Sequence, residues 1–150
     1  MASDLLDGAG RWVENDLMET GSWRVSPILG VKNVRQAAEY YRDVLGFTLD
    51  PLNGVFQPSA DEPGGVYAIV KRYGVSVHLQ IRRGEVARRD SRAGERDVYF
   101  YVNDVGGLHA EFERKGATIL QPPREAPYGL RELVVEDLNG YRLVFGEEFP

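Results

Sequence analysis

The stretch WRVSPILGVKNVRQAAEYYRDVLGF (residues 23–47) contains the signals of a strand, a helix and a helix end in direct succession. Alternating apolar residues predict a strand over residues 23–31. Asn33 predicts a helix start, because its side chain can accept a hydrogen bond from a free backbone N–H of the first turn. Apolar residues then recur at helical spacing, and Gly46 favours the left-handed conformation that ends a helix. The stretch therefore predicts a β-α unit that becomes extended again at Phe47.

The rest of the first half adds three strands to this unit. Residues 47–49 and 66–71 have extended patterns, and residues 75–81 alternate strictly between apolar and polar side chains. This alternation places His78 and its polar neighbours on the face opposite the apolar residues. The predicted order is β-α-β-β-β.

The same order recurs in the second half, from Asp97 onward, in a less regular form. Tyr99 and Tyr101 share one face of its first strand, and Asp104 is suited to cap the helix that follows. Residues 118–121 predict a strand and the proline-rich residues 122–129 a loop. Residues 130–136 and 141–146 predict two strands joined by a tight turn at Asn139-Gly140.

The two halves can be aligned as an internal repeat. With Gly74 placed over Gly140, His78 lies over Val144 and Ser26 over Asp97. Each half would form a sheet with a helix on one face only. Two such modules side by side can curve their uncovered faces into a common cleft, which is the default binding site.

This pattern gives the domain organisation. Residues 1–22 form an acidic N-terminal arm, and residues 23–150 a single domain. Within the domain we expect module 1 at residues 23–81, an arginine-rich linker at 82–96 and module 2 at 97–148.

Composition excludes several classes of function. The chain of 150 residues has a formal net charge of -5, which disfavours nucleic acid as a partner. It has no cysteine, and therefore no disulfide, thiol nucleophile or thiolate ligand. No apolar run approaches the roughly 18 residues of a membrane span, and the acidic N-terminus is unlike a signal peptide. We expect a cytoplasmic protein with no membrane partner.

Two motifs resemble those of the vicinal oxygen chelate superfamily, also called the glyoxalase/bleomycin-resistance/extradiol-dioxygenase superfamily. The first is VKNV (31–34) with YYRDVLGF (40–47), similar to the family pattern V-x-D-V … F-Y-x-x-x-L-G-F. The second is PYGLREL (127–133) with EDLNGY (136–141), similar to Y-G-x-R-x-F-x-V-x-D-P-D-G-N. The resemblance implies an α+β fold of two tandem βαβββ modules that form a curved sheet with a shared cleft.

The resemblance also implies where a metal would lie. Metal enzymes of the superfamily carry His, Glu or Gln ligands on the first and fourth strands of each module. The corresponding positions here are Ser26, His78, Asp97 and Val144. Only His78 and Asp97 are suitable ligands, whereas a catalytic metal site usually has three. We therefore expect no metal cofactor, and glyoxalase and dioxygenase activity are both in doubt.

The leading hypothesis is a binder like the bleomycin-resistance proteins, which sequesters an aromatic or heterocyclic molecule in the cleft and confers antibiotic resistance. Tyr99 and Tyr101 offer flat apolar surface with hydroxyl groups, suited to stacking on such a ligand. His78, Gln80, Ser26 and Asp97 add polar anchors. The predicted ligand-binding residues are Ser26, Phe56, His78, Gln80, Asp97, Tyr99, Tyr101, Arg131 and Arg142.

Two enzymatic alternatives remain open. A lyase or oxidoreductase with an altered divalent-metal site would use His78 and Asp97, with Glu132 or Glu147 from a shifted strand. A metal-free enzyme would use His78 as a general base beside Asp97. Resemblance to small members of the family further implies a homodimer, in some members with exchanged modules.

Overall fold

The computed structural model describes residues 23–50, 54–84 and 95–149. The elements, in chain order, are β1 (Ile28–Val31), α2 (Val34–Asp43), β2 (Thr48–Leu49), β3 (Val55–Phe56), β4 (Tyr67–Arg72), β5 (Val75–Ile81), β6 (Val98–Tyr101), α3 (Val105–Arg114), β7 (Thr118–Glu125), β8 (Leu130–Glu136) and β9 (Arg142–Glu148). The β-α-β-β-β order thus occurs twice, with the short β3 as an addition to the first half. The predicted α+β fold of two modules is confirmed.

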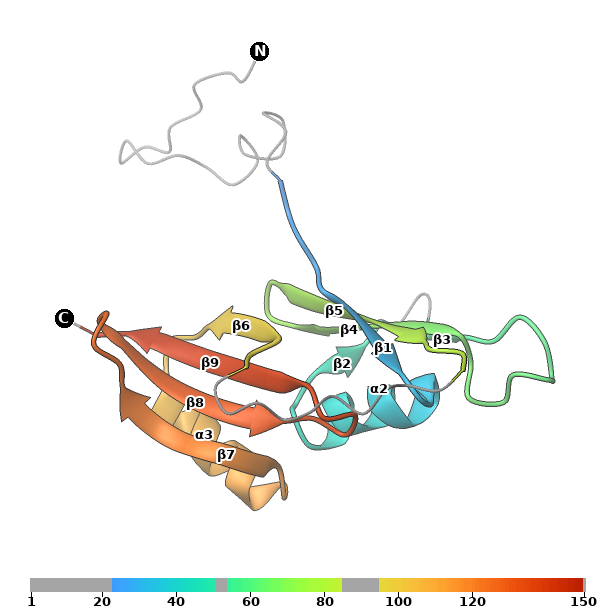
Figure 1. Cartoon of the computed structure of the whole chain (residues 1–150). Coiled ribbons are helices and arrows are strands. Elements are labelled where there is room, and N and C mark those ends of the chain that lie inside the picture. The colour runs from blue at the N-terminus through green and yellow to red at the C-terminus, as the bar shows by residue number, and fades with distance from the viewer. Residues whose placement is uncertain (1–22, 51–53, 85–94, 150) are drawn as a thin grey trace, which may run out of the picture.

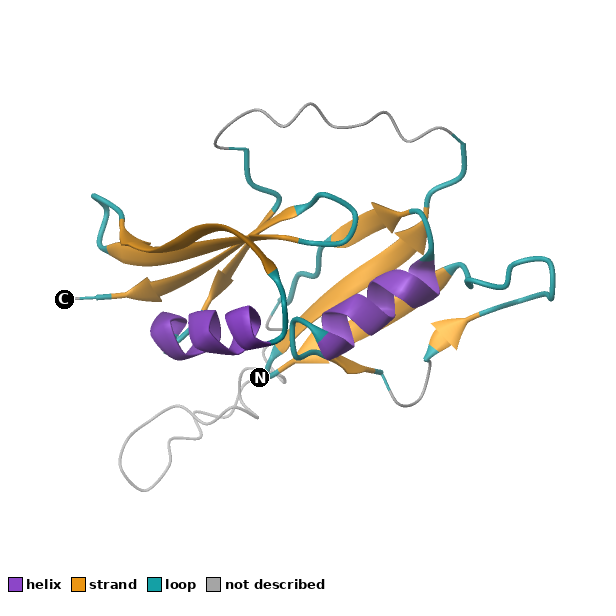
Figure 2. Ribbon diagram, turned by 90° about the horizontal axis from the view of Figure 1, so that it is seen from below, coloured by secondary structure: helices purple, strands orange, loops and turns teal. Residues whose placement is uncertain are grey.

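Each module forms its own mixed sheet. The first sheet has the order β1-β5-β4-β2, with β3 also paired to β4, and the second has the order β6-β9-β8-β7. The first strand of each module is parallel to the last, β1 to β5 and β6 to β9. The sheets lie side by side (Figure 1), and α2 and α3 lie on the same side of them (Figure 2). One face of each sheet is therefore left without a helix, and we call it the open face.

Both helices begin and end as the sequence predicts. The side chains of Asn33 and Asp104 accept hydrogen bonds from the backbone N–H groups of Gln36 and Gly107, both at 2.9 Å. Gly46 and Gly116 follow the helices with φ of 75° and 81°. A residue with a Cβ rarely adopts this left-handed conformation, so glycine is the natural helix stop at both places.

A single hydrophobic core runs through both modules. Its centre is a chain of aromatic contacts from α2 to α3. Ring centroids are 5.4 Å apart for Tyr41–Phe47, 6.1 Å for Phe47–Phe100, 4.8 Å for Phe100–Phe145 and 5.1 Å for Phe112–Phe145. Because Phe47 belongs to one module and Phe100 to the other, the modules bury apolar surface against each other.

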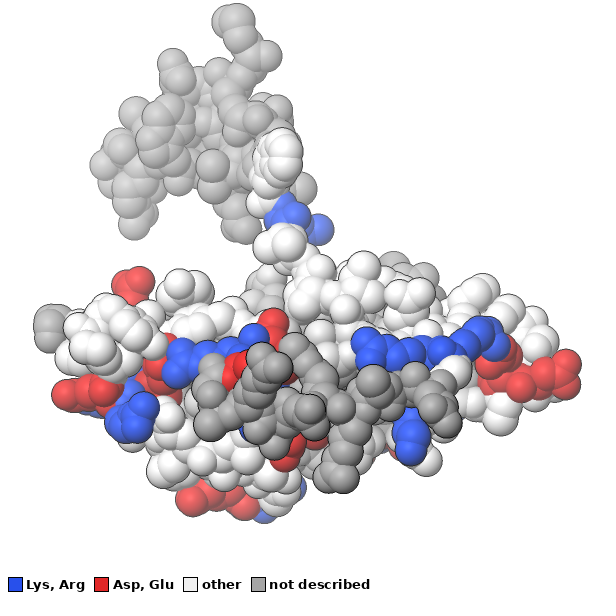
Figure 3. Space-filling view, in the orientation of Figure 1, with Lys and Arg blue, Asp and Glu red and all other residues white. Residues whose placement is uncertain are grey.

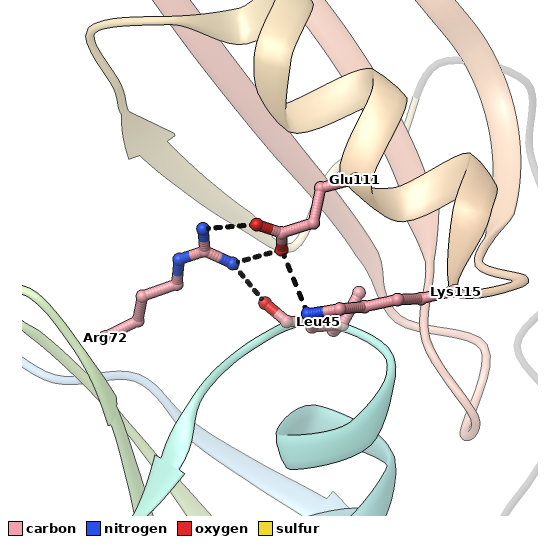
Figure 4. A network of polar contacts seen from close by, with 4 residues as sticks. All are labelled: Leu45, Arg72, Glu111 and Lys115. Atoms are coloured by element: carbon pink, nitrogen blue, oxygen red, sulfur yellow. Dashed lines mark hydrogen bonds and ion pairs between the residues drawn. The ribbon is translucent and has the colours of Figure 1, made fainter.

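Polar contacts fasten the seam between the modules at two ends. At one end the Tyr41 hydroxyl of α2 donates to Oδ2 of Asp137, in the β8–β9 turn, at 2.7 Å. At the other, Arg72 at the end of β4 pairs with Glu111 of α3 through two hydrogen bonds of 2.6 and 3.0 Å (Figure 4). Each helix thus contacts the hairpin of the opposite module, as expected of two repeats related by an approximate two-fold axis.

The structure differs from the sequence prediction in the first strand and in β7. The first strand begins at Ile28, because residues 23–27 have no continuous strand partner among the described residues. β7 continues to Glu125 through Pro122 and Pro123, so the predicted loop is wrong over residues 122–125. Register shifts in the β7–β8 pairing accommodate the two residues that lack a backbone N–H.

The strand β3 was not expected. It has only two residues, which are too few to show the alternation of apolar and polar side chains that predicts a strand. The arm at residues 1–22 and most of the linker at 82–96 lie outside the described residues. None of the helices in the described part of the chain has the length and apolar character needed to cross a membrane.

Candidate functional site

His78 lies at the centre of the open face of module 1. On β5 it pairs in register with Ile69 of β4 and Ile28 of β1. The Tyr67 hydroxyl and Nδ1 of His78 are 2.6 Å apart, and the two rings meet edge to face with centroids 5.5 Å apart. These contacts fix the orientation of the imidazole, and one of its nitrogens is already hydrogen-bonded to the Tyr67 hydroxyl.

The other predicted residues of module 1 surround His78. Gln80 lies two residues after His78 on β5 and therefore on the same face. It pairs in register with both Tyr67 and Gly30. The Ser26 and Ser76 hydroxyls share a hydrogen bond of 2.5 Å. Phe56 of β3 pairs with Tyr67, and its side chain is exposed. The open face of module 1 therefore combines aromatic surface with a few hydrogen-bonding groups.

The open face of module 2 is more closed. Tyr99 of β6 pairs in register with Val144 of β9, which pairs with Val134 of β8. Val144 occupies the position of the fourth metal ligand and is 0% exposed. A Cβ built on the adjacent Gly146 would overlap the Tyr99 hydroxyl, so the Tyr99 ring extends over this glycine. The position corresponding to His78 is thus covered, not open to a ligand.

Tyr99 and Tyr101 lie together at the edge of this face. Their ring centroids are 5.0 Å apart, with planes inclined by 48°. Tyr101 is 70% exposed, whereas the Tyr99 hydroxyl is the one buried side-chain polar atom of the described residues that lacks a hydrogen-bond partner. Burial, and next the carboxylate of Glu132, raise the pKa of Tyr99 well above its usual value.

Asp97 and Arg142 are neighbours at the start of β6 and β9. The Arg142 N–H donates to Oδ2 of Asp97 at 2.9 Å, and the Asp97 N–H donates to the Arg142 carbonyl at 2.9 Å. The Asp97 carboxylate thus helps to join two strands. Arg131 lies apart from the other predicted site residues. Strand alternation places it on the same face of β8 as the core residue Leu133, opposite the face of Glu132. It pairs with Glu125 at 3.2 Å.

The sequence interpretation names Glu132 only as a metal ligand that would require a shifted strand, whereas the structure places this acid on the open face of module 2 in the observed register. Glu132 is only 2% exposed and accepts a hydrogen bond from the Tyr128 hydroxyl at 2.7 Å. Arg96 pairs with the same carboxylate at 3.1 Å. Burial acts to raise the pKa of Glu132, but the hydrogen bond from Tyr128 and the charge of Arg96 outweigh it and leave the pKa below its usual value. Glu132 is therefore a paired carboxylate that anchors the β8 strand to Arg96.

A signal for this cluster was present in the sequence. Glu132 interrupts the otherwise apolar run of LRELVV, and a carboxylate in a buried strand requires a partner. What the sequence could not supply was the partner, because Arg96 is 36 positions away. Tyr67 was missed for the same reason, since its role depends on the register of β4 against β5.

The residues present do not fit a divalent metal centre of the type that the family resemblance implies. Of the four corresponding positions, Ser26 bonds to Ser76 and Val144 has no donor atom. His78 bonds through Nδ1 to Tyr67, and Asp97 accepts a backbone N–H. No group of three or more His, Asp or Glu side chains in the described ranges is placed to hold a metal ion.

One face of the molecule carries charges of both signs. Figure 3 shows acidic and basic side chains of the described residues interspersed on the face that it presents, over both modules. On this face the described basic side chains are divided between the two modules and have acidic neighbours.

Comparison with known proteins identifies the relatives of this chain. The family model described as Glyoxalase/Bleomycin resistance protein/Dioxygenase superfamily matches residues 24–145. No curated protein matches the chain significantly.

Solved structures of low sequence identity share the fold. TioX from Micromonospora sp. ML1 is 22% identical, with 85% of this chain and 100% of that chain covered and a TM-score of 0.64. A glyoxalase-related enzyme from Clostridium phytofermentans is 18% identical, with 85% and 95% covered and a TM-score of 0.66. A superfamily member from Sphaerobacter thermophilus DSM 20745 is 22% identical, with 84% and 98% covered and a TM-score of 0.61. At these identities the likeness concerns the fold alone.

Proposed function

Because this chain belongs to the Glyoxalase/Bleomycin resistance protein/Dioxygenase superfamily, we propose that it binds a small aromatic or heterocyclic molecule without a metal ion. The open faces of the two sheets are the binding surface, and sequestration of the ligand is the function, as in a bleomycin-resistance-type protein. One observation carries the proposal. The two fourth-strand positions hold a histidine bonded to Tyr67 and a fully buried valine that pairs in register with Tyr99.

The chemistry of the open faces favours a flat ligand. Phe56 and Tyr101 are exposed, and aromatic side chains of this kind stack on ring systems with little loss of conformational entropy. His78 and Gln80 lie on the same face of β5 and supply hydrogen bonds that orient the ligand. Apolar area with a few placed polar groups is the usual composition of a small-molecule site.

The proposed form in solution is a homodimer. β1 and β6 each lie at an edge of their sheet, and an edge strand offers backbone groups to a partner, although the Gly30 carbonyl of β1 already accepts from Tyr141. Ile28 on β1 and Tyr101 on β6 expose large apolar side chains at these edges. A second copy that pairs with them would bring open faces of the two chains together around one ligand. We further propose a cytoplasmic location, where a sequestered antibiotic would be kept from its target.

Titration of the purified full chain with bleomycin, phleomycin and a panel of aromatic antibiotics, by isothermal calorimetry, tests the function. We expect saturable binding of at least one compound, weakened about tenfold or more by His78→Ala and by Phe56→Ala. Leu138→Ala is the matched control, because Leu138 is 53% exposed, close to the 59% of Phe56, but lies in the β8–β9 turn. Absence of saturable binding across the panel, or equal losses in all three variants, would overturn the proposal.

A different measurement distinguishes the proposed metal-free binder from the alternative of an enzyme with an altered metal site. Elemental analysis of protein purified without a chelating column reports any resident metal directly. Our proposal requires that zinc, nickel, manganese and iron all be far below one equivalent per chain. One equivalent of metal, lost in His78→Ala, would establish the lyase or oxidoreductase alternative instead.

A further inference from the structure

A cavity of about 640 Å³ lies in the seam between the modules, at the end fastened by Arg72 and Glu111. Its wall on the module 1 side is the β4–β5 turn with Val75, and on the module 2 side it is the first half of α3 with Leu108. Of the residues predicted for the ligand site, only Tyr101 lines it. The cavity is therefore separate from the surface around His78.

Comparison of the two ends of the seam explains the cavity. In the internal repeat, Val75 corresponds to Tyr141. At the other end of the seam Tyr141 crosses between the modules and donates its hydroxyl to the Gly30 carbonyl at 2.8 Å. Asn139 of the same turn accepts from the backbone N–H of Lys32 at 3.2 Å. The end with Val75 has a smaller side chain at the equivalent position, and the space that a tyrosine would fill is open.

The helix contributes to the same opening. α3 begins Val105-Gly106-Gly107, whereas α2 begins Val34-Arg35-Gln36. Gly107 lines the cavity, and the position has no side chain to extend into it. Gly106 has room for a Cβ and costs roughly 0.5–1 kcal/mol relative to alanine, whereas a Cβ at Gly107 would overlap the Asp104 carboxylate. At the end of the seam that contains the cavity, the helix start therefore has a residue that does not give the highest folding stability.

The floor of the cavity is aromatic. It consists of Phe47, Phe100 and Phe145, which are buried members of the central aromatic chain. Tyr101 lies at the rim and is exposed. The volume falls within the range of roughly 300–1,000 Å³ that small-molecule sites occupy. A single ring system can therefore contact the three phenylalanines edge-on or stacked, with centroid distances of about 4.5–7 Å.

The charged side chains around the cavity determine which charge is favoured on the polar group of a ligand. Arg72 directs its guanidinium to both oxygens of Glu111 and to the Leu45 carbonyl, at 2.8 Å for the last (Figure 4). The one cation in the described lining, Arg72, is thus already paired with a carboxylate and donates three hydrogen bonds, which weakens its attraction for an anionic ligand. Asp104 at the rim uses Oδ1 to accept the Gly107 N–H, and no Lys or Arg of the described residues forms an ion pair with it. Beside the aromatic floor the rim therefore carries one exposed carboxylate without an ion-pair partner among the described residues, whereas Glu111 is paired with both Arg72 and Lys115.

We propose that this cavity is a second binding site, which takes a small aromatic molecule with a protonated amine. The ring lies on Phe47, Phe100 and Phe145, and the ammonium group lies at the rim between Asp104 and the face of Tyr101, where carboxylate and tyrosine ring both attract a cation. This site shares Tyr101 with the surface proposed above but neither His78 nor Phe56, so variants at His78 and at Val75 distinguish the two sites.

Three indoles of matched shape test the charge preference. Tryptamine, tryptophol and indole-3-propionate have the same ring and the same two-carbon arm, with a cationic, neutral and anionic end. Binding to the ¹⁵N-labelled full chain is followed by NMR titration. We expect tryptamine to bind at least fivefold more tightly than tryptophol and indole-3-propionate to be weakest. Shifted amide signals should include Gly106, Gly107 and Val75, whereas those of Gln80 and Gly30 should not move.

Two variants test the site itself. Val75→Tyr places at this end of the seam the residue found at the other end, and we expect it to abolish tryptamine binding while the fold is retained. Asp104→Asn keeps the helix cap, as Asn33 does for α2, and removes the charge. We expect it to reduce the preference for tryptamine over tryptophol to less than twofold. Equal affinity for all three indoles, shifts confined to Gln80 and Gly30, or full binding by Val75→Tyr would each overturn the proposal.

Discussion

The Tyr41 hydroxyl and Oδ2 of Asp137 form a buried hydrogen bond of 2.7 Å between the helix of one module and the hairpin of the other. The second carboxylate oxygen, Oδ1, accepts the backbone N–H groups of Asn139 and Tyr141 at 2.8 and 2.9 Å. One buried carboxylate thus shapes the β8–β9 turn and fastens that turn to α2.

Replacement of Tyr41 by phenylalanine should destabilise the protein by about 1–3 kcal/mol. The substitution keeps the ring contacts with Phe47 but leaves Oδ2 of Asp137 buried without its donor, and an unsatisfied buried acceptor has a cost of this size. Urea unfolding followed by circular dichroism measures the change. Tyr73→Phe, at an exposed tyrosine of the turn, is the matched control and should lie within about 0.5 kcal/mol of the parent.

Asp137→Asn should change how stability depends on pH. Burial raises the pKa of Asp137 above its usual 3.8, despite the hydrogen bonds from Tyr41 and the turn. A carboxyl whose pKa is raised in the folded state gives stability below its unfolded pKa and loses it as pH rises through the folded pKa. The variant should therefore gain stability relative to the parent as pH increases from 3 toward 7. Parallel urea titrations at several pH values measure the difference, and a constant offset would contradict the prediction.

Glu111→Gln should show the opposite pH dependence. The hydrogen bonds from Arg72 lower the pKa of Glu111 below its usual 4.5. The pair therefore stabilises the fold fully above the unfolded pKa, and this stability is lost as pH falls through the folded pKa. Both side chains are about four-fifths buried, so we expect a loss of about 1–2 kcal/mol at pH 7. The same pH series applies, and the difference from the parent should vanish at the acidic end.

Gly146→Ala should displace Tyr99. A Cβ at this position would overlap the Tyr99 hydroxyl, and relief requires the ring to leave the face of β9. We expect a loss of about 1–3 kcal/mol, as for other overpacking substitutions. The near-ultraviolet circular dichroism spectrum should also change.

Gly106→Ala is the matched control for Gly146→Ala. Its added Cβ would meet only Oδ1 of Asp104, at an ordinary 3.8 Å. Because this glycine is helical, the substitution should stabilise the protein by about 0.5–1 kcal/mol. Equal effects of the two substitutions would show that Tyr99 is free to move.

Local signals in the sequence were sufficient for most of the fold. Asn33 and Asp104 cap their helices, and Gly46 and Gly116 end them, because each acts on backbone groups a few residues away. The strict alternation of residues 75–81 gave the correct bounds and faces of β5. β7 was extended by its pairing with β8 across Pro122, a tertiary effect that overrides the preference of proline for loops.

The site was harder to predict than the fold, because its contacts join residues that are distant in the sequence. His78, Gln80, Tyr99 and Tyr101 were placed on the open faces because strand alternation alone decides the face. Which residues touch is decided by register and by distant partners. Tyr67 beside His78 and Arg96 beside Glu132 became visible only in the structure, whereas Arg131, predicted for the ligand surface, pairs with Glu125 on the other side of its strand.

The exchange of contacts across the seam bears on how such a chain could have arisen. Each module closes its core with the helix and hairpin of the other, through Tyr41 with Asp137 at one end and Arg72 with Glu111 at the other. An ancestral gene that encoded a single module would have left this surface exposed, and its product would have required a second identical chain for stability. Duplication and fusion of such a gene would have left the two halves free to diverge. The tyrosine at position 141 and the valine at position 75 are a place where the halves differ: the tyrosine bridges the modules at one end of the seam, and a cavity lies at the other.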